Sequence, residues 1–114
     1  MQEMAKLIAT VNGNLDRFRS YLENEILNGS MSASLEDTHD TLMGNVRCVV
    51  MVFERYSYSG GNRVSLSVTL LSDGGPIRVI AITAGGSQGV FWKVNTWGEE
   101  AFLEKLQEAI DAYQ

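Results

Sequence analysis

Apolar residues recur at helical spacing in two segments of the chain. Between residues 15 and 27 they return at every third or fourth position, as on the buried stripe of a helix: Leu15, Phe18, Leu22 and Ile26. Asn14 offers a side-chain cap before this segment, and Asn28-Gly29 offers a stop after it. A second helix is predicted to begin at Thr96, because Thr96-Trp97-Gly98-Glu99 matches a capping box. Its buried stripe is predicted to comprise Phe102, Leu103, Leu106, Ala109, Ile110 and Tyr113.

Alternating or β-branched segments predict strands in the rest of the chain. They cover residues 6–11, 30–36, 46–58, 63–71, 77–83 and 90–94, whereas the polar residues 37–40 predict a turn. The expected fold class is therefore α+β: a two-layer, curved antiparallel sheet of five to six strands with two helices on one face, in the order β-α-β-β-β-β-(β)-α. The length of 114 residues favours a single α+β domain over residues 1–114.

Two glycine-bearing turns predict which side chains share a face of the sheet. A loop centred on Gly60-Gly61 would pair Phe53 with Val68. A loop at Asp73-Gly74 would pair Val68 with Val79. Because side chains alternate along a strand, both loops place the same residues on one face, which two helices would cover: Met51, Phe53, Val64, Leu66, Val68, Leu70, Ile77, Val79 and Ala81.

The opposite face of this sheet is expected to stay open. It would display Val50, Val52, Glu54, Tyr56, Tyr58, Arg63, Ser65, Ser67, Thr69, Arg78, Ile80 and Ile82, with Phe91 and Lys93 near them. Contiguous aromatic and β-branched surface of this kind is typical of an interface or a ligand groove. Small hydroxyl residues such as Ser65 and Ser67 favour the other interpretation, an ordinary hydrated sheet surface.

The predicted function is a non-catalytic binding or assembly module that pairs with itself as a homodimer, or binds a protein partner, through this open face. The predicted binding residues are Glu54, Tyr56, Tyr58, Arg63, Ile80, Ile82, Ser87 and Gln88. Within this set, Glu54 and Arg63 are expected to lie close enough for a cross-strand ion pair. The alternative function is a binder of a small apolar ligand, or an enzyme, with a pocket between the sheet and the C-terminal helix.

Charge and cysteine content narrow the classes of partner and compartment. The net charge of −5 makes a nucleic-acid partner an unfavourable prediction, because the average field of the chain repels polyanions. Cys48 is the single cysteine, which excludes an intrachain disulfide and fits a reducing compartment. No apolar run approaches the length of a membrane span, so no membrane association is expected and the cytoplasm is the predicted location.

No established catalytic pattern emerges from the sequence. The glycines of residues 85–89 lack the strand-loop-helix context of a phosphate-binding loop, although Ser87 and Gln88 within them could contact a ligand. His39 is flanked by carboxylates, but no second ligand stands at metal-site spacing, and pairing it with Cys48 as a nucleophile would require the two to meet in space. A non-enzymatic role without metal or cofactor is therefore favoured, with an enzyme kept as the alternative.

Three stretches resemble an uncharacterised family of small bacterial cytosolic proteins. They are ERYSYSGGNRVSL at residues 54–66, AITAGGSQ at 81–88 and NTWGEE at 95–100, and the resemblance runs from Met4 onward. It implies a bacterial, cytosolic, single-domain protein and brings no established activity or catalytic residue. The order of elements is also similar to the TATA-binding-protein-like and helix-grip folds, which lay helices on a curved antiparallel sheet. A shared fold does not imply a shared function.

Overall fold

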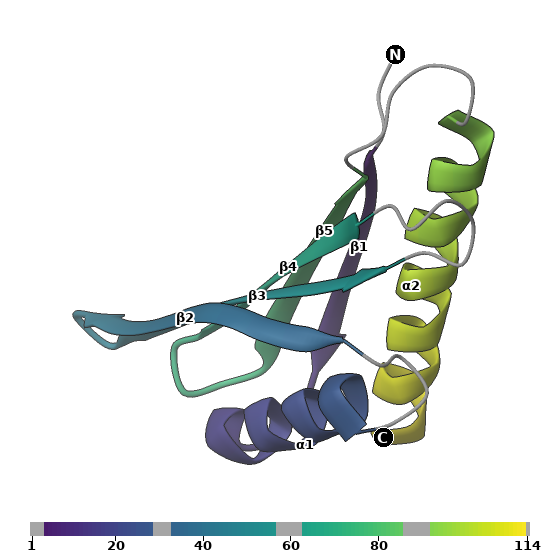
Figure 1. Ribbon diagram of the computed structural model, residues 1–114. Coiled ribbons are helices and arrows are strands. Elements are labelled where there is room, and N and C mark those ends of the chain that lie inside the picture. The colour runs from purple at the N-terminus through teal and green to yellow at the C-terminus, as the bar shows by residue number, and fades with distance from the viewer. Residues whose placement is uncertain (1–3, 29–32, 57–62, 86–91, 114) are drawn as a thin grey trace.

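The computed structural model describes residues 4–28, 33–56, 63–85 and 92–113. The first strand and the first helix are β1 (Met4–Val11) and α1 (Leu15–Asn28). Four more strands and a long helix follow in the chain: β2 (Ser34–Met43), β3 (Val46–Tyr56), β4 (Arg63–Ser72), β5 (Ile77–Gly85) and α2 (Trp92–Tyr113). The predicted α+β class and its order of elements are confirmed for these residues (Figure 1).

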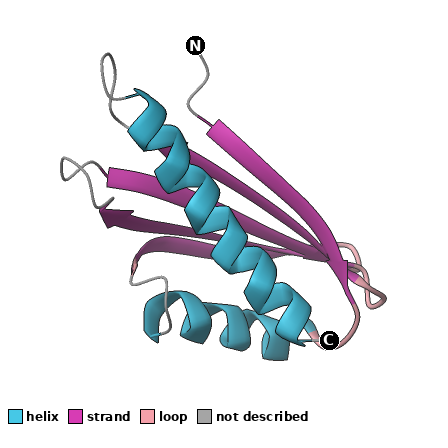
Figure 2. Cartoon of the chain, turned by 90° about the vertical axis from the view of Figure 1, so that its right-hand side faces the viewer, coloured by secondary structure: helices cyan, strands magenta, loops and turns pink. Residues whose placement is uncertain are grey.

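The five strands form one antiparallel sheet in the order β1-β5-β4-β3-β2. Both helices lie on the same side of the sheet, with α2 running in front of it in Figure 2. α2 contacts β1, β5 and β4, whereas α1 contacts β2 and β4 near one end of the sheet. This leaves the other side of all five strands without a covering helix.

The hydrophobic core lies between the sheet and the two helices. All nine sheet residues predicted to share the covered face are buried, with no exposed surface: Met51, Phe53, Val64, Leu66, Val68, Leu70, Ile77, Val79 and Ala81. The predicted helical stripes are also confirmed, with Phe18, Leu22, Phe102 and Leu106 fully buried, except that Tyr113 at the end of α2 is only partly buried. Burial of one such side chain stabilises the fold by roughly 1.5–3 kcal/mol before entropy is subtracted.

The exact strand pairs differ from the prediction by two residues in both hairpins. Phe53 pairs with Leu66 instead of Val68, and Val68 pairs with Ala81 instead of Val79. The second connection is longer than a two-residue turn, because four residues separate β4 from β5 and Gly74 among them adopts a φ of 107°. A shift of two residues keeps every side chain on its predicted face, since the side-chain period of a strand is also two.

The strand predicted for 30–36 is confirmed for residues 34–36, with residues 30–32 outside the described part of the chain, whereas the turn predicted for 37–40 is wrong. β2 continues through these polar residues to Met43, so that Asp37 pairs with Val52 and Asp40 with Val49. Charged residues are tolerated here because β2 is an edge strand with one side in solvent. The hairpin turn instead lies at Gly44-Asn45, a pair favoured in two-residue hairpins, and Gly44 has a φ of 63°.

The C-terminal helix also begins earlier than predicted. Residues 92–94, expected to belong to a last strand, are helical, and Thr96 lies inside α2 instead of capping it. A short apolar run does not distinguish a strand from a buried helical turn, which explains the error. Residues 90 and 91 of that predicted strand lie outside the described part of the chain.

Candidate functional site

On the uncovered side of the sheet, called the open face below, three successive rows of side chains cross the strands next to a further row that holds Ser65 and Glu54. The strand pairs place in successive rows Lys6–Ile82–Ser67–Val52–Asp37, Ile8–Ile80–Thr69–Val50–His39 and Thr10–Arg78–Leu71–Cys48–Thr41. Beyond the third row, Val46 and Met43 flank the β2–β3 turn. The rows alternate with the buried core positions along each strand, so their side chains point away from the helices.

Apolar side chains on the open face are unusually accessible. The large hydrophobic residues exposed in the described part of the chain are Met43 at 82%, Leu42 at 66%, Ile8 at 57%, Val46 at 41% and Ile82 at 39%. All except Leu42 belong to the open face, and half-buried neighbours extend them: Ile80 on β5, and Val50 and Val52 on β3. The apolar surface therefore forms two patches, one on β1 and β5 and one on β2 and β3, with Ser67 and Thr69 of β4 between them in the first two rows.

Charges on the open face are separated by strand. Lys6 on β1 and Arg78 on β5 give one half of the face a positive character, and both side chains are exposed. Asp37 on β2, also exposed, places a negative charge at the opposite edge. Between them, Glu54 and Arg63 form the ion pair expected from the sequence, and the Ser65 hydroxyl donates a hydrogen bond of 3.4 Å to Glu54.

The structure brings together part of the predicted binding set. Glu54, Arg63, Ile80 and Ile82 all lie on the open face. The backbone of Tyr56 ends β3 and pairs with Arg63, whereas its side chain lies outside the described part of the chain. Tyr58, Ser87 and Gln88 lie wholly outside it. Ile8, Val46 and Met43 were missed by sequence reasoning, since their membership depends on β1 pairing with β5 and on the Gly44-Asn45 turn.

His39 and Cys48 lie on the open face, on the neighbouring strands β2 and β3 and in adjacent rows. Cys48 is half-buried. Among the described residues, no hydrogen bond joins the two side chains and no cluster of three or more His, Cys, Asp or Glu residues is arranged to hold a metal ion. A nucleophile activated by a base needs such a hydrogen bond and a third orienting group, so this pair gives no support to nucleophilic catalysis.

The space beneath α2 is filled where the structure describes it. Phe53 and Leu66 of the sheet and Phe102 of the helix are all fully buried. The guanidinium of Arg55 lies 4.8 Å from the centre of the Phe102 ring, which is cation–π distance. The side chain of Trp92, the first residue of α2, lies outside the described part of the chain.

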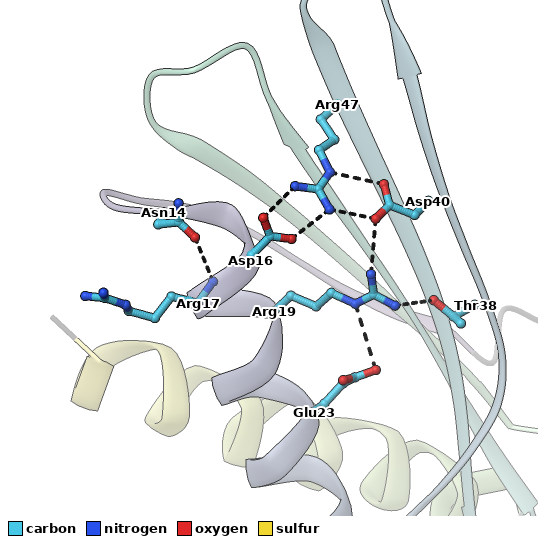
Figure 3. Close-up of polar contacts among 8 residues, drawn as sticks. All are labelled: Asn14, Asp16, Arg17, Arg19, Glu23, Thr38, Asp40 and Arg47. Atoms are coloured by element: carbon cyan, nitrogen blue, oxygen red, sulfur yellow. Dashed lines mark hydrogen bonds and ion pairs between the residues drawn. The ribbon is translucent and has the colours of Figure 1, made fainter.

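A second polar cluster joins α1 to the β2–β3 hairpin on the helix side of the sheet (Figure 3). The guanidinium of Arg47 in β3 donates two hydrogen bonds to each of two carboxylates. The bonds to Asp16 measure 2.7 and 2.9 Å, and those to Asp40 measure 2.7 and 3.1 Å. Arg19 donates to Asp40 at 3.2 Å and to the Thr38 hydroxyl at 3.1 Å. These bonds cross between segments up to 31 residues apart in sequence, so pattern analysis of single segments could not find them.

The electrostatics of this cluster indicate a structural role. Hydrogen bonds from Arg47 lower the pKa of both Asp16 and Asp40, with smaller contributions from its charge and that of Arg19. The same bonds raise the pKa of Arg47. Each carboxylate is thus held ionised by a paired cation, the opposite of what a general acid at neutral pH requires. The cluster instead fixes the start of α1, whose first turn is capped by a 2.9 Å bond from the Arg17 amide to the Asn14 side chain.

A family model matches residues 4–114 of this sequence. The chain belongs to the DUF6054 family, a family of unknown function. No curated protein matches this DUF6054 chain. Among solved structures, it is similar to TTHA0849 from Thermus thermophilus, with 11% sequence identity, a TM-score of 0.32, and coverage of 97% of this chain and 99% of that one. In the described part of the DUF6054 chain, no helix is long and apolar enough to cross a membrane.

Proposed function

We propose that this DUF6054 chain is a non-catalytic assembly module that pairs with a second copy of itself through the open face. The observation that carries the proposal is the concentration of accessible apolar side chains there. Ile8, Ile82, Val46 and Met43 are exposed on a sheet face that no helix covers. Apolar surface of this extent in water favours association, because pairing removes it from solvent.

The size of the open face suits a dimer. Five strands spaced about 4.8 Å apart, with eight residues of about 3.3 Å each, give a face of about 24 by 26 Å, or on the order of 600 Å². Two such faces together approach the lower end, about 1,200 Å², of what stable protein–protein interfaces bury. Sheets that pack face to face in this way are common in proteins, with side chains of the two inner faces interdigitating.

A second copy of the chain suits the charges of the open face better than an unrelated partner whose surface carries charges of only one sign. Lys6 and Arg78 lie on one half of the face and Asp37 lies at the opposite edge, so the face carries both halves of a complementary pair. Because a two-fold dimer uses the same surface on both subunits, such a face can satisfy its own charges. We place the module in the cytoplasm, since Cys48 as its single cysteine fits a reducing compartment.

Sedimentation velocity over a dilution series tests this function with the variant Ile80→Glu. Ile80 lies in the middle row, half-buried between Ile8 and Thr69, and a carboxylate there would be desolvated on pairing. The native chain is expected to dimerise and Ile80→Glu to remain monomeric. Leu42→Glu is the matched control, because Leu42 is 66% exposed on the helix side of β2 and should leave pairing unchanged.

If Ile80→Glu loses its native circular dichroism, Ile8→Glu replaces it, since Ile8 is 57% exposed on an edge strand and tolerates charge more easily. A native chain that stays monomeric at every concentration would overturn the proposal. Equal dimerisation by the native chain and by a folded open-face variant would overturn it as well.

A further inference from the structure

The charge distribution on the open face selects one way of pairing two copies. A two-fold axis lying between facing sheets can run along the strands or across them, and both directions keep the strands of the two sheets roughly aligned. The two arrangements differ in which edges meet. An axis along the strands lays β1 of one copy over β2 of the other, whereas an axis across them lays β1 over β1.

An axis across the strands brings like charges together. The half of the face formed by β1 and β5 would lie on the same half of the partner with the rows reversed, so that Lys6 in the first row approaches the partner subunit's Arg78 in the third. Like charges opposed across an interface are strongly unfavourable. The acidic edges, each carrying Asp37, would face one another at the other end.

We infer that the two-fold axis runs along the strands near β4, so that Lys6 of one subunit faces the partner subunit's Asp37. This inference rests on the proposed function. This rotation keeps the position of each residue along the strands and reverses the order of the strands. Each row of five residues therefore lies over the same row of the partner subunit, running in the opposite direction. Lys6 and Asp37 are the two ends of a single row, so they meet twice in the dimer.

The same rotation matches the apolar parts of the face. In the first row Ile82 lies over the partner subunit's Val52, and in the middle row Ile80 lies over the partner subunit's Val50. These four residues occupy β5 and β3, the strands on either side of β4. Ser67 and Thr69 of β4 lie over their own copies at the axis, so the apolar contacts fall on either side of these hydroxyl residues, and the charge pairs fall at the rim, where interfaces usually carry polar groups.

A charge-reversal cycle tests the inferred axis. Lys6→Asp and Asp37→Lys each create two repulsive contacts per dimer, and each is expected to weaken dimerisation about tenfold at low salt. The double variant Lys6→Asp/Asp37→Lys restores both contacts with reversed sign, so its dissociation constant is expected to return to within about threefold of the native value. Two single effects that simply add in the double variant would overturn the inference.

Cross-linking gives an independent readout of which edges meet. On a Cys48→Ser background, the Lys6→Cys chain is mixed in equal amounts with the Asp37→Cys chain or with the Arg78→Cys chain, and each mixture is treated with a short bis-maleimide. The inferred axis predicts a cross-linked dimer in the mixture of Lys6→Cys with Asp37→Cys and little in the other mixture. Cross-linking of Lys6→Cys with Arg78→Cys instead would place the axis across the strands and overturn the inference while leaving the proposed function intact. A monomeric native chain would overturn both.

Discussion

Tyr21→Phe tests how the two helices are held together beneath the sheet. The Tyr21 hydroxyl of α1 donates a hydrogen bond of 2.5 Å to the backbone carbonyl of Ala109 in α2. The Tyr21 ring also lies 4.8 Å from the ring of Tyr113 and 6.3 Å from that of Phe18, measured between ring centres. The substitution removes the hydroxyl and keeps the aromatic packing, so it isolates one hydrogen bond between helices 88 residues apart.

The expected loss of stability follows from the character of this bond. A neutral, partly buried hydrogen bond contributes about 0.5–1.5 kcal/mol to the free energy of unfolding. For 114 residues, an unfolding entropy of about 2.1 cal/mol/K per residue converts each kcal/mol into about 4 °C of Tm. Tyr21→Phe should therefore lower Tm by about 2–6 °C in thermal unfolding followed by circular dichroism at one fixed protein concentration.

The same substitution should change the response to alkaline pH. Burial, and to a smaller extent Glu25 and Tyr113, raise the pKa of Tyr21 above its ordinary value of 10.0. The folded state thus holds the phenol proton more tightly than the unfolded state, so this contribution to stability is complete below pH 10 and is lost as the pH rises further. Tyr21→Phe should lose less stability over that range than the native chain.

Tyr113→Phe is the matched control, because it removes a hydroxyl from the same ring cluster and keeps the bond to Ala109. Its Tm should fall less than that of Tyr21→Phe. An unchanged Tm in Tyr21→Phe, or equal losses in the two variants, would refute the contribution assigned to the bond.

Two further predictions concern the core and the polar cluster of Figure 3. Leu66→Ala should cost about 2–5 kcal/mol in urea unfolding, because a fully buried side chain is removed; a loss below about 1 kcal/mol would contradict its place in the core. Asp16 and Asp40 have lowered pKa values, so their contribution to stability is present above pH 3.8 and is lost as the pH falls through the folded-state values. Arg47→Gln should reduce that acid-dependent loss in urea titrations at successive pH values, and an unchanged pH dependence would argue against the ion pairs.

The faces of the sheet could be predicted from the sequence, but the exact pairs could not. Alternation with a period of two decides the face of Leu66 or Ile80 without reference to any partner strand. Pairing depends on how many residues each loop contains, and the sequence does not settle whether Ser72 and Pro76 belong to a strand or to a loop. The observed register differed by two residues, which is why the faces were right and the pairs were wrong.

In two segments of the chain, contacts with distant strands decide the structure, and the local sequence pattern does not reveal them. Residues 37–40 have the composition of a turn, but they form an edge strand because β3 offers paired backbone on one side and solvent accepts the charges on the other. The exposed Ile8 belongs to the open face only because β1 closes the sheet beside β5, a pairing between segments about 70 residues apart. Contacts of such long range leave no periodic signal in either segment.

Hydroxyl-radical footprinting of the unmodified DUF6054 chain tests most directly whether the open face is where two copies meet. Oxidation of Ile8 and Ile82, which are 57% and 39% exposed in the single chain, is measured by mass spectrometry in dilute and in concentrated samples. Pairing through this face predicts that both side chains become protected as concentration rises, while Leu42 on the helix side stays equally reactive. Unchanged reactivity of Ile8 and Ile82 across the series, or protection confined to Leu42, would contradict it.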